Sequence, residues 1–89
     1  MSDQKAVIIY LNDKQLSIRV PFAVWQAMMR HKIDTGQSMS ALVVDLLSRH
    51  FDTSDQAEIA TGLQQHKLNT GQSANYLINK LLADRFPAD

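Results

Sequence analysis

The sequence predicts a mainly α-helical protein that begins with a short β-ribbon. Three observations support this fold class. Polar and apolar residues alternate strictly from Gln15 to Val20, helical apolar spacing follows, and residues 31–51 return with a shift of 35 positions at residues 66–86. Alternation is typical of a strand with one buried face, whereas apolar spacings of three and four are typical of amphipathic helices.

The first elements that we expect are two strands within residues 6–20. The apolar members of the alternating segment point to one face, and they are Leu16, Ile18 and Val20. The polar members point to the opposite face, and they are Gln15, Ser17 and Arg19. The preceding run, residues 6–11, is also β-prone and is followed by Asn12-Asp13. Because Asn and Asp favour turns, a hairpin joining residues 6–11 to 15–20 is expected.

Two helices should follow the strands, over residues 21–35, with a start at Pro21 or Phe22, and over residues 38–51. Pro21 suits the first helical turn, because its missing N–H would have no partner there. Gly36 suits the cap that ends the first helix in the left-handed conformation. Ser38 can cap the start of the second helix.

The rest of the chain predicts a second copy of this helical hairpin. The segment His31–Ser38 returns as His66–Ser73, and Thr53–Gln56 has the form of a capping box. The sequence therefore predicts a duplicated helix–turn–helix hairpin with helices at 54–69 and 73–86. The segment before it lacks an alternating apolar pattern, so the strand belongs to the first copy only. The chain divides into an N-terminal unit, residues 1–52, and a second helical hairpin, residues 53–89.

Composition favours a small protein of the cytoplasm. The 89 residues include no cysteine, and the net charge is zero. The polar N-terminus is unlike a secretory signal, and the longest apolar run is too short to cross a bilayer, so we expect no membrane association. Residues 1–51 carry six basic and four acidic side chains, and residues 52–89 carry three and five. This weak positive charge predicts modest non-specific affinity for a nucleic acid.

Residues 14–51 resemble the ribbon-helix-helix family of DNA-binding repressors. The strand places a Gln, a small polar residue and an Arg at alternating sites before a Pro, as Arc-type repressors do, and Gly36 precedes the second helix. The resemblance implies an intertwined homodimer, with higher-order assembly on DNA, whose two strands form a ribbon in the major groove of double-stranded DNA. It implies base contacts by Gln15, Ser17 and Arg19. It also implies a phosphate contact by the backbone amides of Ser38, Met39 and Ser40.

The function that we expect is sequence-specific DNA binding, as a transcriptional repressor or as a plasmid-maintenance or transfer accessory factor. Residues 70–75 offer a second helix start. Because no strand precedes it, we interpret that start as a cap and a packing element.

The width of the ribbon limits how it can enter DNA. Strands lie about 4.8 Å apart. If two chains each added a flanking strand, the resulting sheet would be about 14 Å wide and would not enter an undistorted groove, which is about 12 Å wide.

The alternative is a protein-interaction module on the same fold, such as an antitoxin whose residues 53–89 bind a protein partner. The antitoxin tail is usually disordered, whereas residues 55–86 are well patterned for folding. We expect no enzyme, no cofactor and no metal site. The three histidines are scattered, and Gly36 and Gly71 lack the spacing and the lysine of a phosphate loop.

Overall fold

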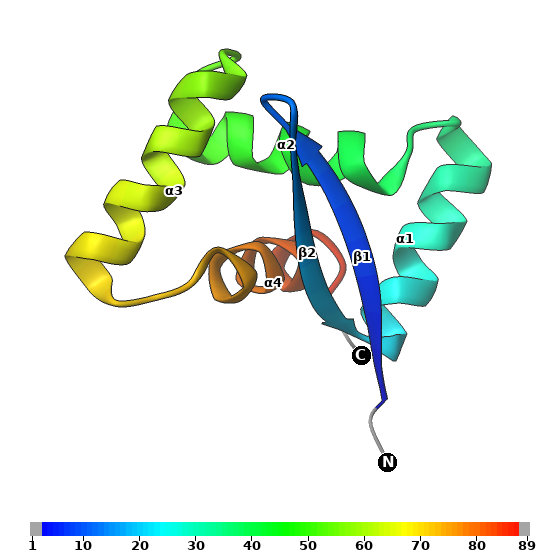
Figure 1. The fold of residues 1–89 in the computed structure, drawn as a ribbon. Coiled ribbons are helices and arrows are strands. Elements are labelled where there is room, and N and C mark those ends of the chain that lie inside the picture. The colour runs from blue at the N-terminus through cyan, green and yellow to red at the C-terminus, as the bar shows by residue number, and fades with distance from the viewer. Residues whose placement is uncertain (1–2, 88–89) are drawn as a thin grey trace.

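The computed structural model describes residues 3–87 and has a β-hairpin followed by four helices in this part of the chain (Figure 1). Residues 1, 2, 88 and 89, at the outer limits of the two predicted units, lie outside the described residues. The elements in chain order are β1 (Gln4–Leu11), β2 (Lys14–Pro21), α1 (Phe22–Thr35), α2 (Met39–Phe51), α3 (Gln56–Thr70) and α4 (Ala74–Arg85).

The predicted hairpin is confirmed. Strands β1 and β2 pair antiparallel, from Gln4 opposite Pro21 to Leu11 opposite Lys14. The two turn residues, Asn12 and Asp13, have φ angles of 52° and 63°. Positive φ at both central residues matches the twist of paired strands, which is why Asn and Asp are suited to this turn. The ribbon is thus formed within one chain.

The helices occur in the predicted order, and each begins one or two residues after the predicted bound. Pro21 ends β2 instead of opening the helix, and the N–H of Phe22 donates to the carbonyl of Asp3 across 2.7 Å. Helix α3 begins at Gln56, because Asp55 is its N-cap and accepts from the N–H of Ala57. The predicted capping box at residues 53–56 is therefore wrong.

One core holds the molecule together. Its buried side chains come from both strands and from all four helices, and they include Val7, Ile9, Ile18, Val20, Met28, Leu42, Val43, Leu47, Ile59, Leu77, Ile78 and Leu82. The N-terminal unit and the second helical hairpin therefore share this core. Helix α2 packs against β1 and α4 packs against β2, while α1 and α3 lie on opposite sides of the hairpin (Figure 1). Within residues 3–87, no helix has both the length and the apolar composition that a bilayer span requires.

Candidate nucleic-acid interface

The hairpin turns one face away from the core, and we call it the outer face. Its central side chains are Ala6, Ile8 and Tyr10 on β1 and Gln15, Ser17 and Arg19 on β2. All six residues are exposed to solvent, including Ile8 at 43% and Tyr10 at 57%. The three residues predicted to contact bases thus lie together, in one row along β2.

The alternation of side chains in β2 explains this arrangement. Ile18 and Val20 are fully buried in the core, and Leu16 is packed against it. Successive side chains of a strand point to opposite faces, so burial of these residues turns Gln15, Ser17 and Arg19 outward. A shift of the strand by one residue would bury Arg19 and expose Ile18, which the hydrophobic effect opposes.

Three central pairs of residues face each other across the outer face, and Gln4 lies opposite Pro21 at one end of it. Ala6 lies opposite Arg19, Ile8 opposite Ser17, and Tyr10 opposite Gln15. In these three central pairs the β1 side chain is apolar or aromatic, whereas the β2 side chain is polar. Side chains directly opposite each other in an antiparallel pair are within contact distance, so both rows would meet the same ligand.

Both edges of the hairpin are held by side chains of α2 and α4. On the β1 edge, the N–H of Tyr10 donates to Ser40 Oγ across 2.8 Å. On the β2 edge, the N–H of Arg19 donates to Asn75 Oδ1 across 2.7 Å, and Asn79 Nδ2 donates to the Arg19 carbonyl across 2.7 Å. Unpaired backbone N–H and C=O groups at the edge of a sheet can pair with another strand. These contacts satisfy edge groups of the hairpin at two points, which favours a ribbon that stays two strands wide.

The start of α2 lies beside β1. Ser38 is its N-cap and accepts from the N–H of Ala41 across 3.1 Å, as the sequence predicts. Ser40 contributes its hydroxyl to the Tyr10 contact. Within residues 3–87, the N–H groups of Ser38, Met39 and Ser40 donate to no protein acceptor. These three amides lie at the positive end of the helix dipole, where an anion is favoured.

The start of α4 occupies the corresponding position beside β2. Ser73 is its N-cap and accepts from the N–H of Tyr76 across 3.2 Å. The interpretation of residues 70–75 as a cap and packing element, made because no strand precedes them, is incomplete. Asn75 binds β2 of the same chain. The shift of 35 positions that relates Ser40 to Asn75 is the sequence signal that could have identified this residue.

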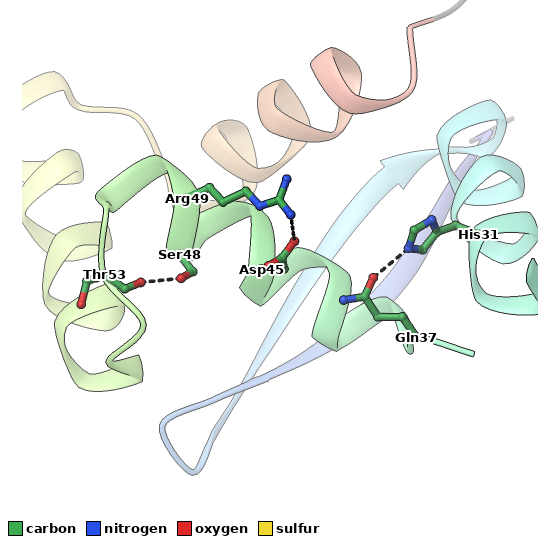
Figure 2. A network of polar contacts seen from close by, with 6 residues as sticks. All are labelled: His31, Gln37, Asp45, Ser48, Arg49 and Thr53. Atoms are coloured by element: carbon green, nitrogen blue, oxygen red, sulfur yellow. Dashed lines mark hydrogen bonds and ion pairs between the residues drawn. The ribbon is translucent and has the colours of Figure 1, made fainter. Parts of the chain in front are cut away.

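The loops that precede α2 and α4 have the same hydrogen bonds. His31 Nε2 and Gln37 Oε1 are 2.7 Å apart (Figure 2), and His66 Nε2 and Gln72 Oε1 are 2.8 Å apart. Gly36 and Gly71 both have a φ of 77°, and the N–H of each donates to a lysine carbonyl across 2.8 Å. These contacts hold both helix starts in the same local geometry.

Other polar contacts of α2 lie toward its C-terminal end. Arg49 pairs with Asp45 across 3.4 Å, and Ser48 Oγ donates to the Thr53 carbonyl (Figure 2). Among the described residues, no group of three or more histidine or acidic side chains is arranged to hold a metal ion.

A comparison of the chain with protein-family models, curated proteins and solved structures finds no match.

Proposed function

We propose that this chain is a sequence-specific DNA-binding protein that inserts the β1–β2 hairpin into the major groove. The single observation that carries the proposal is the row of Gln15, Ser17 and Arg19 on the exposed face of a two-stranded ribbon. The major groove is about 12 Å wide and admits a ribbon of two strands, which lie about 4.8 Å apart.

The width of the ribbon supports this proposal further. A four-stranded sheet made from two chains would be too wide for the groove. The contacts of Tyr10 with Ser40 and of Arg19 with Asn75 cover edges at which such extra strands would have to pair. In this arrangement β1 supplies the second strand, which in the ribbon-helix-helix family comes from the partner chain.

The three polar side chains suit base recognition. An arginine donates two hydrogen bonds to guanine O6 and N7, and a glutamine pairs with adenine N6 and N7. A serine accepts from or donates to several bases. Arg19 would therefore specify a guanine and Gln15 an adenine, with Ser17 between them. Each good two-point contact discriminates against the wrong base by about 1–3 kcal/mol.

The helix starts would fix the ribbon in register on the phosphates. The unpartnered amides of Ser38, Met39 and Ser40 lie beside β1, and the start of α4 at Ser73 lies beside β2. Phosphate contacts of this kind position a protein on DNA without carrying sequence information. The biological role would be that of a cytoplasmic transcriptional repressor or of a plasmid-maintenance or transfer accessory factor.

Fluorescence anisotropy tests this function. Purified protein is titrated onto DNA fragments from its own replicon over a series of salt concentrations. We expect selective binding that weakens as salt rises, because counterions are released from the phosphates that the protein contacts. Arg19→Ala should lose about 1–3 kcal/mol of selectivity between the preferred and the other fragments.

Arg49→Ala is the matched control. It removes the same charge from a side chain that is 76% exposed, on α2 and away from the outer face. We expect it to weaken binding to all fragments alike and to leave selectivity unchanged. Equal effects of the two substitutions would contradict base recognition by Arg19.

The rival function is that of a protein-interaction module, and one observation favours it. Leu68 and Tyr76, on the second helical hairpin, are 79% and 54% exposed. Apolar side chains left in solvent can mark a protein-binding surface. If the folded protein binds no fragment even at low salt, groove binding is excluded and this rival becomes the better explanation.

A further inference from the structure

The starting observation is a correspondence between two hydrogen bonds. Ser40 accepts from the Tyr10 N–H on one edge of the ribbon, and Asn75 accepts from the Arg19 N–H on the other. Ser40 and Asn75 are equivalent in the sequence repeat. A rotation that exchanges the helix pair α1–α2 with the pair α3–α4 exchanges Ser40 with Asn75. It must therefore also exchange Tyr10 with Arg19, the residues that they bind.

The pairing register of the two strands is consistent with the same rotation. Tyr10 and Arg19 are nine positions apart, and so are Ile9 and Ile18, which are both fully buried. Applied to the outer face, the rotation exchanges Ala6 with Gln15 and Ile8 with Ser17. Ile8 and Ser17 lie directly opposite each other. An approximate two-fold axis thus passes through this central pair, as it would in a ribbon made by two identical chains.

The side chains on the outer face break this symmetry. One end of the ribbon carries Arg19 with Ala6, and the other carries Gln15 with Tyr10. A ribbon of two identical strands would present the same pair at both ends and would match a palindrome, since operator symmetry mirrors protein symmetry. Here the buried residues keep the symmetry, and the exposed ones do not.

We infer that a single copy of this chain recognises an asymmetric DNA site. The inference rests on the proposed function and specifies its ligand. The half-site under Arg19 and Ala6 contains a guanine, because arginine donates to guanine O6 and N7. The half-site under Gln15 and Tyr10 contains an adenine. The central pair places the apolar side chain of Ile8 where it can contact a thymine methyl group.

Selection from a random DNA pool with the purified 89-residue chain tests this inference. We expect the selected site to be non-palindromic, and native mass spectrometry to find one chain on each duplex. Two palindromes are then made, each from one half of the selected site. Both should bind more weakly than the selected site, by roughly 5- to 150-fold for each mismatched base pair.

A gain-of-symmetry variant gives the converse result. The triple substitution Ala6→Gln, Ile8→Ser and Tyr10→Arg copies the β2 residues onto β1, and all three positions are exposed. Circular dichroism and a thermal melt establish that the variant is folded. We expect it to bind the palindrome built from the guanine half-site at least tenfold more tightly than the wild type does.

The outcomes separate this inference from the proposed function. A palindromic selected site, or two chains on each selected duplex, would overturn the asymmetric single-chain site while DNA binding stands. If the wild type selects no sequence at all, both the inference and the proposed function fail.

Discussion

Asn75 accepts a hydrogen bond from the backbone N–H of Arg19 across 2.7 Å, although the two residues are 56 positions apart. This contact ties the start of α4 to the edge of β2. It also holds the backbone of the residue that we propose to contact guanine. The second helical hairpin therefore acts on the ribbon directly, through this bond and through the core that both share.

Asn75→Ala should destabilise the protein modestly. The substitution removes the acceptor of the Arg19 N–H at an exposed edge, where water can replace it. A typical intramolecular hydrogen bond contributes about 0.5–1.5 kcal/mol, and we expect the free energy of unfolding in urea to fall within that range. Asn69→Ala, at an exposed position near the end of α3, should change it by less than about 0.5 kcal/mol.

Asn75→Asp keeps an acceptor for the Arg19 N–H and adds a negative charge at the start of α4. Its carboxylate can still accept from Arg19, and a negative charge in the first turn of a helix is favourable. We expect unchanged or slightly higher stability in urea. The same charge would repel a phosphate, so affinity for DNA should fall in the anisotropy assay. Loss of stability with unchanged DNA affinity would contradict both parts of this account.

Ile78→Ala tests whether α4 is part of the core. The Ile78 side chain is fully buried among residues of both units, so its truncation leaves a cavity. Substitutions of this kind typically cost about 2–5 kcal/mol, a large share of the stability of a small domain. Leu68→Ala is the control, because Leu68 is 79% exposed. Urea unfolding should show a single transition, and equal effects of the two substitutions would exclude the shared core.

Local features of the fold could be predicted from the sequence because they depend on neighbouring residues. The alternation around Ile18, the left-handed conformation of Gly36 and the cap at Ser38 were all predicted and are all present. The capping box at Thr53 was wrong for an equally local reason. Thr53 and Asp55 are both suitable caps, and Asp55 holds the helix start while Thr53 donates to Glu58 across 2.7 Å.

The candidate site was only half predictable for a different reason. Gln15, Ser17 and Arg19 follow from alternation, which is a property of one strand. The role of Asn75 depends on a contact with a residue 56 positions away, and no local pattern encodes such a contact. The pairing of residues 6–11 with 15–20 was predicted because the Asn12-Asp13 turn is local, and β1 pairs with β2 in this way. The second chain that the family resemblance implies stays a prediction.

Gly36→Ala and Gly71→Ala should destabilise the protein to a similar extent. Both glycines have a φ of 77°, and a Cβ at either position would meet nothing within 4 Å. The cost is therefore conformational and amounts to about 1–2 kcal/mol for a residue in the left-handed region. Gly36→Asn should cost less, because asparagine tolerates this conformation. Thermal and urea unfolding measure these differences, and a cost at only one of the two glycines would mean that the loops are not equivalent.

Gly62 lies in the interior of α3, where alanine is normally favoured over glycine by about 1 kcal/mol. A Cβ at this position would lie 3.0 Å from Cδ1 and 3.1 Å from Cε1 of Phe51. The ring of Phe51 is packed against the core, so a movement away from the new Cβ would disturb that packing. Gly62→Ala alone should therefore give no gain in stability.

A double-mutant cycle with Phe51→Leu isolates this contact. Leucine is smaller, so Gly62→Ala in the Phe51→Leu background should regain up to about 1 kcal/mol of helix propensity. We expect a coupling energy of at least 0.5 kcal/mol between the two positions, as is usual for residues in contact. An increase of about 1 kcal/mol for Gly62→Ala in the wild-type background would mean that the ring of Phe51 does not restrict this position.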